Sequence, residues 1–589
     1  MANEVKWTEE QKQAIYEKGS NILVAAAAGS GKTAVLVERI INKIINENID
    51  IDKLLVVTFT NAAASEMRER VLDAIYKKID ENPEDERLQR QVTLLNKASI
   101  CTIDSFCLDV VRNNFFEIDI SQNFRIGDTT EIEILKQDVL EDLFEEKYEA
   151  EDKDFEKLIN TYTSYKDDTP LKELILKIYT YIQSNPFPEK WLHEKIEMFN
   201  LSERLDQDFA KTIWGKLLLK QVDEILQEGI IKLEAEKSNL AKYDELQKYF
   251  LIINDDIGQL EMLKSNLDSW DKAYTIASSI KFKTWSADKK LTLEAKDIAK
   301  VTRDLVKESL KKVLNKILIF DSKEANEDIN DMYEVLTKLE KIIIEFGEKF
   351  AKRKKDKNVV DFSDVEHFAL KILLKEENGE VKPSEIAKKY QEKFEEIAID
   401  EYQDSNLVQE YILTSISKGN NIFMVGDVKQ SIYKFRQARP DLFLGKYKTY
   451  KTKYYKTEND DLKIQLFRNF RSRREVLDFS NMIFASIMTE ELGELNYTIE
   501  EYLNLGASYE DTNQDLRAEI DILNVDEISE EDIESDSANN ATDDLEEKER
   551  IENIELEAKF VAKRIQQLIS NKFQVYDAKK KEKRDIKYK

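Results

Sequence analysis

Residues 22–33 join a buried-strand pattern to a short loop that could bind phosphate. Ile22 to Ala26 are apolar, and a helical pattern begins at Lys32. The residues expected to surround the phosphates are Ala26, Ala27, Ala28, Gly29, Ser30, Gly31, Lys32 and Thr33. Backbone N–H groups at the start of a helix favour anions. Lys32 would reach the β- and γ-phosphates, and the Thr33 hydroxyl would bind Mg²⁺.

This loop departs from the usual phosphate-loop pattern at its first position, which is normally Gly and is here Ala26. The alternative interpretation is a chance Gly/Ser turn between a strand and a helix. Because both flanking elements are present in the sequence, the phosphate loop is the preferred interpretation.

Two adjacent carboxylates, Asp400 and Glu401, follow the apolar run Ile397–Ile399. A phosphate loop needs such a partner: Asp400 would hold Mg²⁺ through its shell, and Glu401 would polarise the attacking water. Acidic residues often terminate strands, so this pair alone is weak evidence. The phosphate loop upstream and the segment 402–406 downstream strengthen it.

The elements that would position these residues alternate between strands and helices. Further apolar runs at 54–59, 99–103, 396–400 and 421–426 predict strands. Such alternation is typical of an α/β fold with a parallel sheet. Between residues 130 and 350 the apolar residues recur at three- and four-residue spacing, as in 131–143 and 335–350. We therefore expect a helical insertion in an α/β domain, with the Tyr and Trp residues of the insertion serving helix packing.

Composition narrows the class of protein. The 589 residues predict about three or four domains at ~150 residues each. With 14 glycines, 6 prolines and 35% charged residues, the chain should be rich in helix. A net charge of −28 argues against a basic DNA-coating protein, although an enzyme needs only a basic groove.

Other chemistries and locations are restricted by what the sequence lacks. Two cysteines and two histidines exclude a disulfide framework, a Cys₄ cluster and most zinc or Ser-His-Asp sites. We expect both histidines to be ordinary surface or packing residues. The sequence shows no signal peptide and no apolar run of ~18 residues, so we expect no membrane association and a cytoplasmic location.

The segment Asp400–Asn406 (DEYQDSN) resembles the Walker B motif of superfamily 1 helicases of the UvrD/Rep type. Further segments resemble motifs of that family in the same order: Trp7–Ile15, Thr58–Ala64, Val425–Arg436 and Leu466–Ser472. Within the family, the closest resemblance is to the AddA subunits of AddAB helicase–nucleases. That likeness depends on the four alanines of the phosphate loop, on Thr102–Cys107 and on Gly426–Gln430.

The resemblance implies roles for further residues at the nucleotide. Gln11 would read the adenine edge, and Gln430 would contact the γ-phosphate and change partner after hydrolysis. Arg471 would reach the γ-phosphate from across a cleft, as an arginine finger does. The alternative for Gln430 and Arg471 is an ordinary surface hydrogen bond or ion pair.

Contacts with single-stranded DNA are implied for Phe59, Asn61, Tyr433 and Phe435. Aromatic faces stack on unpaired bases with little dependence on sequence. The alternative for each aromatic residue is core packing. One departure concerns Asp104, where the family often has His, so no role that needs an imidazole is expected there.

The resemblance also implies a domain plan. Residues 1–128 and 356–460 would form the two parts of a RecA-like ATP-binding domain, with the helical insertion at 129–355. Residues 461–589 would be an incomplete second motor domain, so we expect the later helicase motifs and a nuclease domain to be missing. The segment Asp361–Asp364 resembles a family segment, but a helix N-cap at Ser363 or Asp364 explains it equally well.

The final part of the chain carries blocks of like charge. Residues 526–557 are strongly acidic and predict a solvated linker or mobile loop. Residues 557–565 predict an amphipathic helix, and the basic tail 579–589 has no strand or helix pattern.

The function implied by the resemblance is that of an ATP-dependent 3′→5′ DNA helicase within a helicase/nuclease complex. It would use ATP and Mg²⁺ to move on single-stranded DNA, act on duplex ends in double-strand break repair and recombination, and pair with an AddB-like subunit. The alternative is a fragment that binds ATP and single-stranded DNA without productive turnover. A P-loop small-molecule kinase or transport ATPase does not fit the Asp400–Asp404 box or the candidate base-stacking residues.

Overall fold

The computed structural model describes residues 6–163, 167–286, 293–377, 379–458, 460–509, 515–523, 542–577 and 582–588. The chain divides into two compact units, Met1–Phe470 and Arg471–Lys589. Each unit is described by itself.

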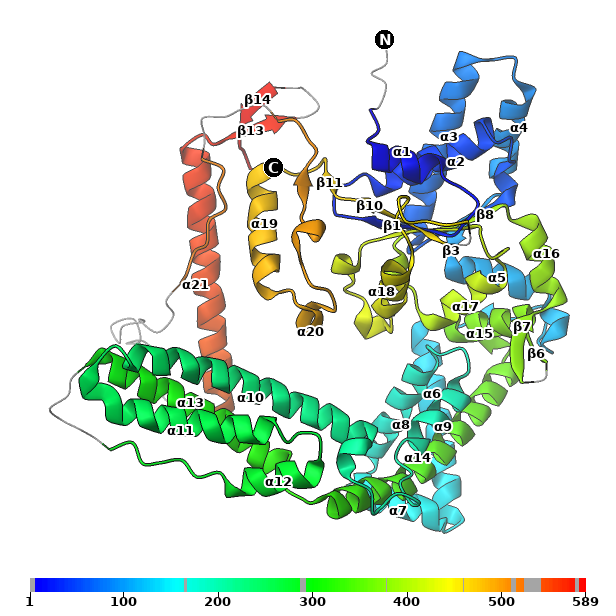
Figure 1. The fold of residues 1–589 in the computed structure, drawn as a ribbon. Helices are drawn as coiled ribbons and strands as arrows, with labels where there is room; N and C mark the ends of the chain where they lie inside the picture. The colour runs from blue at the N-terminus through cyan, green and yellow to red at the C-terminus, as the bar shows by residue number, and fades with distance from the viewer. Residues whose placement is uncertain are drawn as a thin grey trace. The chain divides into compact units, whose positions relative to one another are not determined.

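A six-stranded parallel sheet in the order β10-β1-β9-β8-β2-β3 forms the centre of the first unit (Figure 1). Its strands are β1 (Ile22–Ala26), β2 (Leu54–Thr58), β3 (Ser99–Thr102), β8 (Glu396–Ile399), β9 (Ile422–Gly426) and β10 (Leu462–Leu466). Strands β2, β8 and β9 are buried along their whole length, as expected for a sheet covered on both faces. The five strands predicted from apolar runs, including the one before the phosphate loop, are confirmed.

The sixth strand, β10, was not expected in this sheet. Ile22 of β1 pairs with Leu462 of β10, and the two strands lie side by side although 440 positions separate them (Figure 1). The boundary predicted between residues 460 and 461 therefore precedes the last strand of the first sheet. The compact units divide ten residues later, after Phe470.

Helices cover both faces of the sheet because consecutive strand residues point to opposite sides. Ile22 and Val24 belong to one hydrophobic cluster, whereas Leu23 between them belongs to the other. The first cluster contains residues of α1 (Glu9–Tyr16), α2 (Lys32–Ile45), α3 (Asn61–Glu81) and α4 (Glu86–Leu95). The second contains residues of α5 (Ile103–Asn113), α15 (Phe362–Leu373), α16 (Glu385–Lys393), α17 (Leu407–Ser415) and α18 (Pro440–Thr449).

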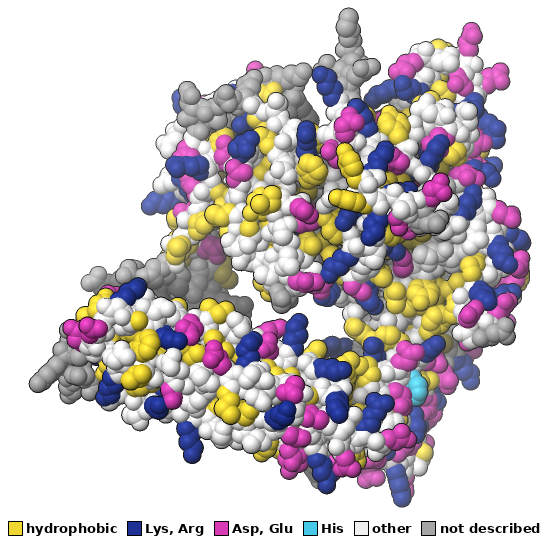
Figure 2. Space-filling model, viewed as in Figure 1, with side chains coloured by type: hydrophobic (Ala, Val, Ile, Leu, Met, Phe, Trp, Pro, Cys, Tyr) yellow, Lys and Arg dark blue, Asp and Glu magenta, His cyan; other side chains and the backbone are white. Residues whose placement is uncertain are grey.

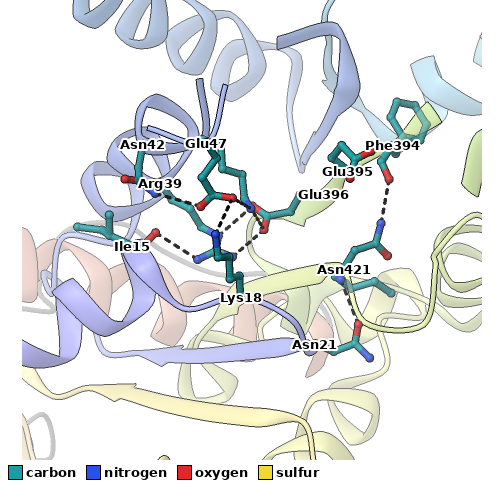
Figure 3. Close-up of polar contacts among 12 residues, drawn as sticks. Ile15, Lys18, Asn21, Arg39, Asn42, Glu47, Phe394, Glu395, Glu396 and Asn421 are labelled. Carbon is teal, nitrogen blue, oxygen red and sulfur yellow. Dashed lines mark hydrogen bonds and ion pairs between the residues drawn. The ribbon is translucent and has the colours of Figure 1, made fainter. Parts of the chain in front are cut away.

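A buried ion pair ties α2 to the start of β8 (Figure 3). Arg39 donates two hydrogen bonds to Glu396, from Nε at 2.9 Å and from Nη2 at 2.6 Å. It also donates to the Ala14 carbonyl at the end of α1, and Lys43 adds a second cation 3.0 Å from the same carboxylate. Although burial raises the pKa of Glu396, the charges and hydrogen bonds of Arg39 and Lys43 hold it below its usual range.

The helical insertion lies between two short strands, β4 (Arg125–Ile126) and β5 (Val359–Val360), which pair in parallel. This pairing closes the two ends of the inserted segment. Its longer helices are α6 (Thr129–Glu149), α7 (Lys153–Tyr162), α8 (Thr169–Ile182), α9 (Pro188–Glu197), α10 (Ile213–Leu240), α11 (Gln247–Lys264), α12 (Trp270–Ser279), α13 (Glu294–Lys316) and α14 (Ser322–Asp356). The helices predicted at 131–143 and 335–350 are confirmed within α6 and α14.

Two hydrophobic clusters hold these helices together. One cluster contains residues of helices α6, α7, α8, α9 and α14. The other contains residues of α10, α11, α12 and α13. The fully buried Trp270 donates its Nε1–H to the Phe320 carbonyl at 3.0 Å, which confirms a packing role for this residue. On the face seen in Figure 2, Lys and Arg side chains alternate with Asp and Glu over this segment. None of the helices that the structure describes is long and apolar enough to cross a membrane.

The second unit contains α19 (Arg474–Ile487), α20 (Glu490–Gly493), β12 (Asn504–Leu505) and α21 (Thr542–Ser570), followed by the antiparallel pair β13 (Gln574–Asp577) and β14 (Glu582–Asp585). The helix predicted at 557–565 is confirmed within α21.

Two expectations for the second unit are corrected. Residues 542–557 of the acidic block, expected as a linker or loop, are helical, whereas 524–541 lie outside the described residues. The tail from 579 was expected to lack regular structure, but residues 582–585 form strand β14. Its charged sequence EKRD has no apolar alternation that could have indicated a strand.

Candidate nucleotide and DNA site

The predicted chemistry gathers at one edge of the parallel sheet. Because all six strands run in the same direction, the loops that follow them meet at their carboxyl ends, where α/β proteins bind ligands. The phosphate loop follows β1, Phe59 follows β2, Asp400 follows β8, and the Gln430 and Tyr433 segment follows β9.

Two glycines give the loop after β1 its shape. Gly29 and Gly31 have φ values of 69° and 85°, a left-handed conformation that favours glycine. Gly31 is also the N-cap of α2, and a Cβ there would lie 3.3 Å from Gln11 Nε2. In contrast, Ala26 is the last residue of β1 and has extended backbone, so this position does not need the glycine of the usual pattern.

Side chains from both ends of the first unit fix this loop. Gln11, 5% exposed, donates from Nε2 to the Ser30 carbonyl at 3.0 Å. Its Oε1 accepts from the Thr8 amide in a capping box at the start of α1. Asn469 of β11 (Arg468–Asn469) donates to the Ala28 carbonyl at 2.7 Å. Gln11 is therefore placed against the loop, and its contact with adenine stays a prediction.

Lys32 and Glu401 form an ion pair across the site. Lys32 Nζ lies 2.8 Å from Oε2 and 3.1 Å from Oε1 of Glu401. Glu401 has a φ of 51°, which costs a non-glycine residue about 1–3 kcal/mol and persists only where the surroundings fix it. The structure thus brings the predicted phosphate-binding cation onto the predicted water-activating carboxylate.

The neighbouring carboxylates have perturbed acidity. Burial, and then the charge of Glu401, raise the pKa of Asp400 to about 6, and Lys32 opposes this shift. The same two causes, in the same order, raise the pKa of Asp404 to about 6. Thr33 is the second residue of α2, directly after Lys32. Metal binding by Thr33 and Asp400 stays a prediction.

Gln430 and Arg471 lie in different units. Gln430 ends a short 3₁₀ turn (Val428–Gln430) after β9, and its Nε2 donates to Asp427 Oδ2 at 2.8 Å. It is therefore at the expected edge of the sheet. Arg471 is the first residue of the second unit. Its role as an arginine finger stays a prediction.

The candidate DNA-binding aromatics form a row beside the nucleotide site. The rings of Phe59 and Tyr433 have centroids 4.7 Å apart, and those of Tyr433 and Phe435 are 5.9 Å apart. Phe435 is 74% exposed, which excludes core packing for it, whereas Phe59 is 37% exposed. Asn61 is exposed at the first position of α3, directly after the Thr60 N-cap.

A cavity of about 450 Å³ lies between this row and the carboxylates. Its lining includes Phe59, Tyr433, Glu401 and Asp104. Burial raises the pKa of Asp104. Asp104 thus lies in the lining of the cavity at the carboxyl ends of the strands.

The comparisons with known proteins agree with this arrangement. A family model described as the UvrD/REP helicase N-terminal domain matches residues 7–451, about three quarters of the chain. The chain belongs to the UvrD/Rep helicase family.

Three relatives, each named as the A subunit of an ATP-dependent helicase/nuclease, resemble the chain over most of its length. The protein from Clostridium beijerinckii is 44% identical over 99% of this chain and 47% of its own length. The corresponding values are 43%, 96% and 46% for Clostridioides difficile, and 46%, 86% and 41% for Thermoanaerobacter sp.. The chain therefore spans about half the length of the curated relatives that it matches.

For this UvrD/Rep family member, sequence reasoning missed three features of the site. Arg436 lies over the rings of Tyr433 and Phe435, at 5.4 and 5.7 Å from their centroids. Asn469, which binds the phosphate loop, was visible only as part of a motif assigned to the second motor domain. The cavity lining also includes Asn406 and Gln409. They could have been suspected because Asn406 ends the Walker B segment and Gln409 follows three residues later.

The segment 361–364 is a helix cap, as the alternative interpretation held, but the capping residue differs. The Asp361 carboxylate caps α15 by accepting from the Asp364 backbone amide. The Asp364 carboxylate in turn accepts from the Asp361 backbone amide. The predicted part of Asp364 in a helix cap is therefore confirmed, although the N-cap residue itself is Asp361 and not Ser363. The two histidines make ordinary contacts, with Glu340 for His193 and with the Gln183 carbonyl for His367.

Proposed function

We propose that the chain is the motor part of an ATP-dependent DNA helicase that moves 3′→5′ on single-stranded DNA. The observation that carries the proposal is the shared edge of the sheet. The Lys32–Glu401 pair and the Phe59–Tyr433–Phe435 row both lie there, within a single compact unit. Nucleotide chemistry and DNA contact can therefore act on the same loops.

The residues of the loop fit a magnesium nucleotide. Ser30 is 1% exposed and its Oγ is buried without a hydrogen-bond partner. The glycines allow the backbone to approach a phosphate, and the ammonium of Lys32 would exchange the Glu401 carboxylate for phosphate oxygens. Thr33 and Asp400 would hold Mg²⁺, which neutralises charge on the phosphates when bound.

Hydrolysis would then use the carboxylate that Lys32 releases. Glu401 would accept a proton from water as the water oxygen bonds to the γ-phosphorus and the bond to the bridging oxygen breaks, giving ADP and phosphate. Gln430 would contact the γ-phosphate and lose that contact on product release. Arg471 would stabilise the charge from the second motor domain, to which we assign residues 471–589.

DNA would bind by stacking on the aromatic row. Base stacking on aromatic side chains contributes about 1–3 kcal/mol per base and tolerates any sequence. Arg436 would add a cation beside the rings without requiring a basic surface elsewhere, which agrees with the net charge of −28.

The wider assignment rests on the relatives. Their name, which makes each of them one component of a helicase/nuclease, supports a multi-subunit enzyme, and we propose an AddB-like second component. The 3′→5′ direction and a role at duplex ends in double-strand break repair follow from the resemblance to AddA.

The test is ATP hydrolysis by the 589-residue chain with and without single-stranded DNA. We expect single-stranded DNA to stimulate hydrolysis, because the candidate DNA contacts and the nucleotide site lie at the same ends of the strands. Equal, slow hydrolysis with and without DNA, together with retained ATP binding, would instead identify an ATP- and DNA-binding fragment without productive turnover.

A further inference from the structure

The buried side chain of Gln403 connects the two halves of the nucleotide site. It belongs to a 3₁₀ turn (Tyr402–Asp404) after the Walker B carboxylates and is 1% exposed. Its Nε2 donates to Glu401 Oε2 at 3.0 Å and to Asp404 Oδ2 at 3.2 Å. Its Oε1 accepts from the Asp427 amide at 2.9 Å. A neutral amide is suited to this place because it donates to carboxylates on one side and accepts on the other.

The contacts of Gln403 continue to the predicted γ-phosphate sensor. Asp427, 3% exposed, accepts from Gln430 Nε2 through its Oδ2 at 2.8 Å. An unbroken series of polar contacts therefore runs from Lys32 through Glu401, Gln403 and Asp427 to Gln430. Tyr433 of the aromatic row follows three residues after Gln430.

The close fit of β9 against Gln403 is independent evidence that this contact is specific. A Cβ built at Gly426, the last residue of β9, would lie 2.4 Å from Gln403 Oε1 and 3.3 Å from its backbone nitrogen. A methyl group there would have to displace the Gln403 amide oxygen, and its contact with the Gln403 backbone nitrogen would be tight. Glycine at 426 is thus needed for close approach rather than for an unusual backbone angle.

Gln403 holds the Glu401 carboxylate in a way that does not depend on Lys32. Among the described residues, the side chains hydrogen-bonded to Glu401 are those of Lys32 and Gln403. When a phosphate attracts Lys32, Glu401 loses one of these two hydrogen-bonding partners. The amide of Gln403 then keeps Oε2 in place, although the left-handed backbone of Glu401 would otherwise favour rearrangement.

We propose that Gln403 is a positioning residue for ATP hydrolysis. It orients Glu401 while Lys32 is engaged with the nucleotide, and it links this carboxylate to the Asp427–Gln430 turn that precedes the DNA-contacting aromatics. This inference rests on the proposed function of the site.

Two variants separate the orientation of Glu401 from the link to the Asp427–Gln430 turn. Gln403→Met is similar in length and removes both the donor and the acceptor. Gln403→Glu keeps an acceptor for the Asp427 amide but removes the donor to Glu401. The matched control is Gln91→Met: Gln91 is also fully buried, accepts from the Ile51 amide at 2.9 Å and donates to Asp50 at 2.7 Å. Asp50 and Ile51 precede β2, at the opposite edge of the sheet.

For each full-length variant, the Kd of ATP, kcat with and without single-stranded DNA, and the melting temperature are measured. We expect Gln403→Met to change the Kd less than about threefold, to lower kcat about 100-fold, and to abolish stimulation by DNA. Gln403→Glu should lower kcat similarly but keep the ratio of stimulated to basal rates. Gln91→Met should lower only the melting temperature.

A normal kcat for both Gln403 variants would overturn the proposal. So would a loss of kcat in Gln91→Met as large as that in Gln403→Met, because the loss would then reflect lower stability alone. Failure of the proposed function is recognised separately. In that case the unaltered chain itself hydrolyses no ATP, and Lys32→Ala does not change ATP binding, which overturns the role of Gln403 as well.

Discussion

Glu396 accepts two hydrogen bonds from Arg39, at 2.9 and 2.6 Å, with both side chains almost completely buried. This pair joins the helix of the phosphate loop to the strand that carries the Walker B carboxylates (Figure 3). Glu396→Ala would leave two buried cations, Arg39 and Lys43, without their carboxylate. We expect it to lower the free energy of unfolding by about 3–5 kcal/mol, measured by urea denaturation.

The control is the pair between Arg125 and Glu131, which has similar bidentate geometry but is exposed to solvent. Glu131→Ala should change stability little, because exposed ion pairs are screened by water and salt. Since the pKa of Glu396 is lowered, the stability from this pair is present above pH 4.5 and is lost as the pH falls below that value. Equal effects of the two substitutions would contradict the importance of burial.

Glu366 of α15 gives stability the opposite dependence on pH. It accepts from Gln409 at 2.8 Å, and burial is the main cause that raises its pKa from 4.5 to about 7. Stability from the protonated form is complete below pH 4.5 and is lost as the pH rises through about 7, roughly 3 kcal/mol in all. Glu366→Gln, which is neutral at every pH and keeps a carbonyl for Gln409, should remove this loss.

Thermal unfolding at several pH values checks this expectation. The variant should melt at a higher temperature than the unaltered chain at pH 8 and at nearly the same temperature at pH 5. Glu84→Gln, on the exposed loop between α3 and α4, serves as the control and should change neither value. A lower melting temperature for Glu366→Gln at pH 8 would show that the ionised carboxylate is needed.

The strands and loops at the centre of the site could be predicted from the sequence, because each is indicated by residues that are neighbours in the chain. Strands such as β2 and β9 are continuous apolar runs, since both faces of the sheet are covered, and the loops at their ends carry the glycines and carboxylates. The short distance between Lys32 and Glu401 then follows from parallel strands in one sheet.

Long-range pairing could not be predicted in the same way. Strand β10 is the outermost strand beside β1, and its residues alternate between buried and half-buried. Only its pairing with β1 shows that it belongs to the first sheet. The contact between Asn469 and Ala28 depends on that pairing. The role of Gln403 could not be predicted from the sequence for a related reason. It depends on a hydrogen bond from the backbone amide of Asp427, 24 positions away in the chain.

Substitutions at Lys32 and Glu401 should separate ATP binding from hydrolysis. Lys32→Ala removes the cation expected to bind the β- and γ-phosphates and leaves Glu401 without its ion-pair partner, so ATP binding should be lost. Glu401→Gln keeps the size of the side chain but cannot accept a proton, so binding should persist while kcat falls about 10²- to 10⁴-fold. A fluorescent ATP analogue and a phosphate-release assay measure the two quantities.

The control for these two variants is Lys12→Ala, which removes a lysine from an exposed ion pair with Glu9 on α1. It should change neither binding nor turnover. Hydrolysis by Glu401→Gln at the rate of the unaltered chain would show that another group activates the water.

The exposed ring of Phe435 should contribute to DNA affinity without selecting a sequence. Loss of one stacked base costs about 1–3 kcal/mol, which corresponds to roughly 5- to 150-fold in Kd. Phe435→Ala should therefore weaken binding of oligo(dT) and of a mixed-sequence oligonucleotide by similar factors, measured by fluorescence anisotropy at one fixed salt concentration. Tyr454→Ala is the control, because Tyr454 is 97% exposed but precedes β10 and so lies at the other edge of the sheet. If Tyr454→Ala weakened binding as much as Phe435→Ala, the DNA path would not follow the Phe59–Tyr433–Phe435 row.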